Sequence, residues 1–188
     1  SGTNSFERQE TPGIYQAEID LTSGRLLSER TLIWEGTGSI APEGPHLYRI
    51  NGLYYLVIAE GGTEYGHMVT IARGDSPYGP FESCPNNPIL THRSSGHSIQ
   101  ATGHADLVQT EDGSWWAVFL GIRPVSIPFE GRYHHLGRET FLAPVTWTSD
   151  GWPVIGEGGT VSEMMNTHSP SLEAESVWME KDDFDSNQ

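Results

Sequence analysis

Apolar and polar residues alternate along most of this chain in short runs that end at Gly, Pro, Asn or Asp. Residues Ile14–Asp20 alternate as expected of a half-buried β-strand. Leu53–Glu60 is a longer apolar run, and it follows Asn51-Gly52, a strong signal for a tight β-hairpin turn. Few stretches are rich in helix-forming residues, so the pattern predicts an all-β fold.

The predicted strands fall into units with the same order. The aromatic and apolar segments Tyr54–Val57 and Trp115–Val118 occupy equivalent places in two of these units, which is typical of repeat architectures. Groups of four strands indicate propeller blades, and residues 14–34 resemble the outer half of a further blade. The predicted strands of the two fuller units are Pro45–Arg49, Leu53–Glu60, His67–Arg73 and Phe81-Glu82, then Ala105–Gln109, Ser114–Leu120, Thr140–Trp147 and Trp152–Ile155.

Two and a half to three blades do not close a ring, because propellers typically have about four to eight. We therefore expect the chain to be an interior piece of a larger propeller. Residues 1–11 are polar, and we predict that they are disordered. Residues 12–160 are predicted to form the partial propeller, and residues 161–188 an acidic linker.

Composition narrows the classes of partner. The 188 residues are enough for one domain, with 36% hydrophobic residues, and the formal net charge of −15 argues against nucleic acid or anionic membranes as partners. Six Trp and seven Tyr are compatible with sugar binding, although most aromatic rings are expected in the core. Cys84 is the single cysteine, so no internal disulfide forms, and the sequence leaves the cellular compartment open.

Glu43 is the first candidate for chemistry. Pro42 and Gly44-Pro45 flank it, so a stiff turn at the mouth of a strand would position its carboxyl at low entropic cost. An aromatic setting provided by Tyr48 and Tyr65 would raise its pKa and suit it to donate a proton. The alternative is an ordinary glutamate on a surface turn.

Two further segments carry candidates. His104 lies between small neighbours and is predicted to open the inner strand of its blade, as a functional residue or a hydrogen-bonded structural histidine. Arg138 precedes another strand, either in a structural ion pair with a neighbouring carboxylate or as an arginine that serves a site. The glycine-rich loop Glu60–His67 lacks the features of a phosphate-binding loop, and we expect it to wall a small pocket.

Taken together, these segments resemble glycoside hydrolase family 43, specifically its β-xylosidase branch. The resemblance runs in order from about residue 12 to residue 155. It rests on residues 43–48, 54–56, 59–63, 67–73, 87–91, 103–107, 136–140 and 150–153.

The resemblance implies a five-bladed β-propeller that hydrolyses β-1,4-xylosides, with α-L-arabinofuranosides as a further substrate class, by inversion of configuration. Glu43 would be the general acid. His104 would lie near the propeller axis, where it would bind substrate and where some members hold a calcium ion through water. Arg138, Thr63 and Tyr65 would bind substrate. No other cofactor is implied.

The resemblance also implies what this chain lacks. Nothing in it matches the family's base aspartate or its second aspartate, so we expect the isolated chain to be nearly inactive without blades supplied by the same or another chain. Residues Asp182–Ser186 resemble the start of the β-sandwich that follows many such propellers.

Two other functions remain open at this stage. One is a non-catalytic carbohydrate-binding propeller fragment that would use aromatic faces with His104 and Arg138. The other is a structural assembly in which copies pair through exposed blade edges.

Overall fold

The computed structural model describes residues 11–127, 131–165 and 167. Over these residues the chain forms thirteen β-strands and no helix, which confirms the predicted all-β class. Accordingly, the described residues include no helix able to cross a membrane. Residues 1–10 of the segment 1–11 that is predicted to be disordered lie outside the described residues, as does most of the predicted acidic linker with the expected start of a sandwich. Both stay predictions.

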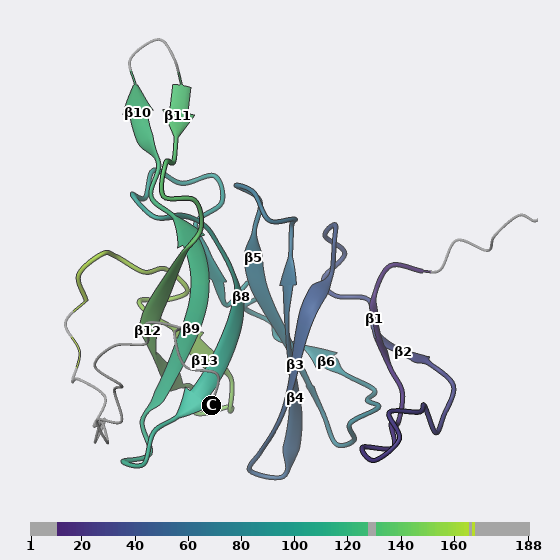
Figure 1. The fold of residues 1–188 in the computed structure, drawn as a ribbon. Helices are drawn as coiled ribbons and strands as arrows, with labels where there is room; N and C mark the ends of the chain where they lie inside the picture. Colours follow the sequence, from purple (N-terminus) through teal and green to yellow (C-terminus); the bar gives the residue numbers. More distant parts are fainter. Residues whose placement is uncertain (1–10, 128–130, 166, 168–188) are drawn as a thin grey trace, which may run out of the picture.

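The strands form two larger antiparallel sheets and two ribbons (Figure 1). The first ribbon pairs β1 (Ile14–Gln16) with β2 (Thr31–Trp34). The middle sheet has the order β3 (Glu43–Ile50), β4 (Leu53–Glu60), β5 (Met68–Gly74) and β6 (Glu82–Ser83), with β7 (Leu90–Thr91) also paired to β5. The last sheet has the order β13 (Pro153–Ile155), β12 (Glu139–Trp147), β9 (Trp115–Ile122) and β8 (Gln100–Gln109). The second ribbon pairs β10 (Val125–Ile127) with β11 (Gly131–Tyr133) and projects beyond the end of the last sheet (Figure 1).

The predicted strand β4 has the expected bounds, but the inner strands of both sheets differ from prediction. β3 begins at Glu43 rather than Pro45, and β8 begins at Gln100, before His104. Both strands contain bulges: the register shifts between Glu43 and His46 in β3, and on both sides of Gly103 in β8. A bulge interrupts the alternation of residues on a strand, so the period-two pattern misses these segments. The hairpin β10–β11 lies between the predicted strands Ser114–Leu120 and Thr140–Trp147, where the sequence pattern predicts no strand.

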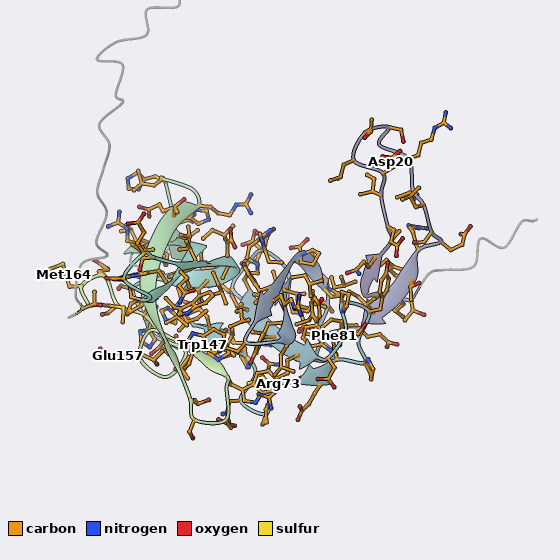
Figure 2. All side chains as sticks on the ribbon, turned by 90° about the horizontal axis from the view of Figure 1, so that it is seen from below. Asp20, Arg73, Phe81, Trp147, Glu157 and Met164 are labelled. Carbon is orange, nitrogen blue, oxygen red and sulfur yellow. The ribbon has the colours of Figure 1, made fainter. Side chains whose placement is uncertain are left out.

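Both faces of the middle sheet are covered. Tyr55 and Val57 of β4 belong to a buried cluster that continues into β8, β9 and β12, whereas Leu56 and Ile58 pack on the other face against Ile14 and Trp34 of the first ribbon. Side chains fill the space between the sheets, and the loop bearing Asp20 stands apart (Figure 2). Burial on both faces explains why β4 is a continuous apolar run.

Arg73 of β5 links the two larger sheets. Its guanidinium lies 4.1 Å from the centre of the Trp152 ring and donates a hydrogen bond of 2.6 Å to the Asp150 carbonyl. The Tyr55 hydroxyl donates to the Gly151 carbonyl at 2.7 Å. These contacts attach the turn between β12 and β13 to the middle sheet, and so hold the two neighbouring blades together.

Candidate active site

Glu43 is the first residue of β3, and its side chain is exposed. It pairs with Ala59 of β4, and a bulge separates it from His46. Ala41 and Gly44, on either side, have positive φ angles of 54° and 58°. Such conformations are uncommon for alanine and occur often at functional sites, where a bulge can redirect a side chain. The backbone around Glu43 is therefore irregular, with a bulge and two left-handed residues close to it.

A buried carboxylate fixes the segment that leads to Glu43. Glu60, with 0% exposure, accepts hydrogen bonds from the backbone N–H and the hydroxyl of Thr37 and from the hydroxyl of Thr70. The N–H of Gly61 bonds to the carbonyl of Ile40 at 2.8 Å. The end of β4 thus anchors residues 37–40, just before the turn that carries Glu43. Sequence reasoning placed Glu60 in the pocket loop and missed this anchoring role.

His104 packs against Gly44, the residue that follows Glu43. It lies in the bulged part of β8 with a φ of 52°, and the residue is exposed. A Cβ atom added to Gly44 would be 2.4 Å from His104 Nε2 and 2.7 Å from its Cε1, so the imidazole rests against the Gly44 backbone. The structure therefore places His104 of one blade against Gly44, the residue that follows Glu43 in the other blade.

His67 is a further group at this place that sequence reasoning did not single out. It is 1% exposed, and its Nδ1 lies 3.1 Å from the carbonyl oxygen of Ala101. Burial lowers the pKa of His67, while the bond to Ala101 and the charge of Glu43 raise it and the charges of His104 and Arg138 lower it. The geometry places the His67 ring against Gly103, the residue just before His104. The sequence signal was the histidine at the end of the glycine-rich loop.

Arg138 approaches the same region from the start of β12. Its Nη1 donates to Thr63 Oγ1 at 3.0 Å, which joins it to the glycine-rich loop. The neighbouring Glu139 pairs instead with Arg123, at 2.6 Å, and this partner holds the pKa of Glu139 below its ordinary value. The sequence left open an ion pair between Arg138 and a neighbouring carboxylate. In the structure, Glu139 pairs with Arg123.

The glycine-rich loop walls a pocket, as expected. The cavity has a volume of about 290 Å³ and is lined by Thr63, Glu64, Ile122, His134, Gly137 and Arg138. It lies where β9 ends and β12 begins. Tyr65, 37% exposed, belongs to the same loop.

Tyr48 has a different environment from the one predicted. Its hydroxyl donates to the Asp106 carboxylate and accepts from the N–H of Leu107 at 2.8 Å. Burial, followed by the bond to Asp106, raises the pKa of Tyr48 above its ordinary value. His46 Nδ1 lies 3.5 Å from the same carboxylate. Tyr48 therefore ties the inner strands β3 and β8 together, rather than providing an apolar wall for Glu43.

The described residues offer calcium no ready-made group of carboxylate and histidine ligands. Ca²⁺ takes about six to eight oxygen ligands, and no group of three or more His, Cys, Asp or Glu within the described ranges is arranged to hold a metal ion. His104 offers a ring nitrogen, which fits contact with calcium only through water. Calcium near the axis stays a prediction.

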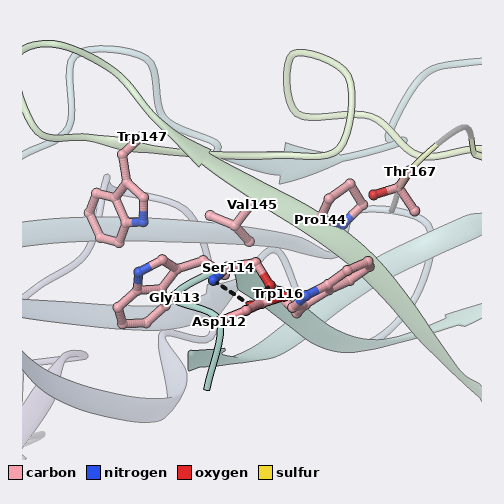
Figure 3. Close-up of a pocket in the computed structure, with 9 residues that line it drawn as sticks. Asp112, Gly113, Ser114, Trp116, Pro144, Val145, Trp147 and Thr167 are labelled. Carbon is pink, nitrogen blue, oxygen red and sulfur yellow. Dashed lines mark hydrogen bonds between the residues drawn. The ribbon is translucent and has the colours of Figure 1, made fainter. Parts of the chain in front are cut away.

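Another pocket lies in the blade formed by β8, β9, β12 and β13, at the end opposite Arg138 (Figure 3). It has a volume of about 540 Å³, and its lining includes Trp115, Trp116 and Trp147. β9 and β12 pair from Glu139–Gly121 at one end to Val145–Trp115 at the other. Six residue steps at about 3.3 Å each place this aromatic pocket roughly 20 Å from the Arg138 end. It is therefore separate from the candidate site.

Comparison with known proteins agrees with the family resemblance found in the sequence. The family model described as glycosyl hydrolases family 43 matches residues 2–153. A non-reducing end alpha-L-arabinofuranosidase of Bacteroides ovatus is 51% identical over 171 residues, which are 89% of this chain and 31% of that protein. A beta-xylosidase of Bacillus subtilis is 37% identical over 187 residues, 96% of this chain and 35% of the relative.

Solved structures agree. The Bacteroides ovatus xyloglucan-locus GH43B protein matches with a TM-score of 0.78 and 48% identity over 94% of this chain and 34% of its own. The GH43 BlXynB protein from Bacillus licheniformis gives a TM-score of 0.79 and 45% identity, over 94% of this chain and 34% of that one. The chain spans about a third of the length of these relatives. These matches confirm the predicted resemblance and the partial propeller fold.

Proposed function

Because the chain belongs to glycosyl hydrolase family 43, we propose that it carries the acid side of an active site that cleaves terminal β-1,4-xylosidic or α-L-arabinofuranosidic bonds. The observation that carries this proposal is the contact between blades at Gly44, where the His104 ring of β8 packs on the backbone next to Glu43. Arg138 joins the glycine-rich loop that follows β4 through its hydrogen bond to Thr63. The names of the relatives, arabinofuranosidase and beta-xylosidase, support the substrate class.

Glu43 acts as the general acid in this proposal. Its exposed carboxyl at a strand end is open to a bound sugar, and the bulged backbone limits where it can point. In an inverting glycosidase the acid protonates the leaving oxygen while a base activates water on the opposite face of the sugar, with the two carboxyls about 6.5–9.5 Å apart.

The base then comes from outside this chain. Asp106 is the aspartate on the inner strands β3 and β8, and it is engaged by Tyr48 and His46. We infer that blades supplied by the same or another chain bring the base aspartate and complete the site.

His104, Arg138, Thr63 and Tyr65 bind the sugar in this proposal. An arginine carries five N–H donors, and one nitrogen of Arg138 bonds to Thr63. The remaining donors of Arg138 suit sugar hydroxyls. Arg138 shares the pocket of about 290 Å³ with Thr63 and Glu64 of the glycine-rich loop. This loop follows β4, whose Ala59 pairs with Glu43, which supports a common site.

A chimera tests the proposal. The chain replaces the matching third of the B. ovatus arabinofuranosidase, and release of nitrophenol is measured from 4-nitrophenyl α-L-arabinofuranoside and β-D-xyloside. We expect activity on one or both from the chimera and almost none from the chain alone. Glu43→Gln should lower kcat by about 10²–10⁴-fold, and the loss should shrink with 2,4-dinitrophenyl glycosides, whose leaving group needs less protonation.

Glu111→Gln, at an exposed turn on the far end of β8, is the matched control and should leave the rate unchanged. Full activity of the Glu43→Gln chimera, or an equal loss with both leaving groups, would contradict the general acid role. Binding of xylobiose that survives Glu43→Ala, without turnover in the chimera, would favour the non-catalytic carbohydrate-binding function.

A further inference from the structure

Two histidines among the described residues are equally buried, and they differ in whether Nε2 has a partner. His67 and His92 are each 1% exposed, and each places Nδ1 near a backbone carbonyl, that of Ala101 at 3.1 Å and that of Ile99 at 2.7 Å. Since a carbonyl only accepts, each ring carries its proton on Nδ1 and keeps a lone pair on Nε2. His92 Nε2 accepts from the N–H of Val161 at 2.9 Å. His67 Nε2 is buried and has no partner among the described residues.

An unpaired buried acceptor destabilises the folded state, because it has lost its hydrogen bonds to water without replacement. The space occupied by His67 would hold an apolar ring without that cost. Packing alone therefore does not explain a histidine here, and the remaining polar contact is the bond from Nδ1–H to Ala101.

That bond acts on a strained segment next to His104. Ala101 and His104 have φ angles of 53° and 52°, and the register of β8 shifts on both sides of Gly103. The His67 ring lies over Gly103, where an added Cβ would be 2.4 Å from ring atoms Cε1 and Nδ1. His67 thus contacts the backbone on both sides of Thr102, immediately before His104.

The packing between the blades is reciprocal. His67, just before β5 of the middle sheet, covers Gly103 of β8, while His104 of β8 covers Gly44 of β3. Through these two contacts, the position of the bulge in β8 is coupled to the position of the residue next to Glu43.

We propose that His67 is a positioning residue: its Nδ1–H holds the Ala101 carbonyl and thereby sets the place of His104 against Gly44, beside Glu43. His67 acts through the backbone of β8 and need not touch substrate. The proposal rests on the proposed function for its effect on catalysis, whereas its effect on His104 can be measured without activity.

Three variants of the chimera separate the bond from the packing. His67→Asn keeps an amide N–H near the position of Nδ1, His67→Gln moves the amide to the position of Nε2, and His67→Phe keeps a ring but no donor. We expect His67→Phe and His67→Gln to lower kcat by about 10–100-fold with KM changed less than about threefold, as for a misplacement near 1 Å. His67→Asn should stay within about threefold of the parent.

His92→Phe is the matched control, because it removes an equivalent bond away from Glu43. It should lower thermal stability but leave kcat per folded molecule unchanged. Wild-type kcat in both His67→Phe and His67→Gln would overturn the proposal, as would an equal loss in all three His67 variants. If His67→Phe does not fold, the comparison of His67→Asn with His67→Gln decides.

A second measurement uses the chain itself and distinguishes the two proposals. The ring protons of His104 are followed by NMR through a pH titration in each variant. A midpoint that moves in His67→Gln and returns in His67→Asn supports positioning even if the chimera is inactive, in which case the proposed function alone fails. An unchanged His104 titration in every variant would overturn the positioning role.

Discussion

The contact between His104 and Gly44 yields the most exact prediction, through the variant Gly44→Ala. Gly44 has a φ of 58°, and its added Cβ would lie 2.4 Å, 2.7 Å and 2.8 Å from three atoms of the His104 ring. The methyl group therefore has to displace the imidazole, the backbone of β3, or both. Because Glu43 precedes Gly44, either displacement also moves the candidate acid relative to its neighbour.

The magnitude has two parts. An alanine in the left-handed region costs about 1–2 kcal/mol, and forcing a methyl into occupied space costs about 1–3 kcal/mol. The sum lowers the free energy of unfolding by about 2–5 kcal/mol. Gly52 provides the control: its φ is 88°, in the turn between β3 and β4 of the same sheet, and no atom lies within 4 Å of its added Cβ. Gly52→Ala should therefore show the backbone part alone.

Urea unfolding of the chain, followed by tryptophan fluorescence, measures these differences in a double-mutant cycle. His104→Ala removes the ring, so Gly44→Ala in that background should cost little more than Gly52→Ala. The coupling between Gly44→Ala and His104→Ala should be about 1–3 kcal/mol. A coupling below about 0.5 kcal/mol, or equal costs at Gly44 and Gly52 in the parent, would refute the packing described for His104.

Three further predictions concern stability. Arg73→Ala should lower the midpoint of urea unfolding, and Arg73→Lys should not restore it, because the lysine lacks the planar group that stacks on Trp152; recovery with lysine would contradict this. Glu60→Gln should cost about 1–3 kcal/mol by weakening its buried bonds, and an unchanged midpoint would contradict the anchoring role. The buried His67 and His92 have pKa values below the ordinary 6.5, so the unfolded chain binds more protons. The contribution of these histidines to the free energy of unfolding should be fully present above pH 6.5 and should decrease as the pH falls toward their folded-state pKa values. The decrease should be steeper than in a His92→Phe variant. The same slope in both would contradict the contribution of His92.

Much of the fold and part of the site could be predicted from the sequence, because the signals are local. Alternation and turn residues predicted the strands, including β4 with its bounds, and the prolines and glycines around Glu43 predicted a constrained strand end. The glycine-rich loop predicted a pocket wall, which the structure bears out. Each of these depends on residues within a few positions of one another.

The sequence alone thus determined the all-β class, the repeating units and the candidates Glu43, His104 and Arg138. Only the tertiary structure decided that β8 is bulged before His104, that Arg138 bonds to Thr63, and that the His67 ring packs on Gly103. The physical reason is that these features arise where side chains of one blade meet the backbone of the next. Such contacts depend on how the sheets pack, and no local pattern of residues encodes them.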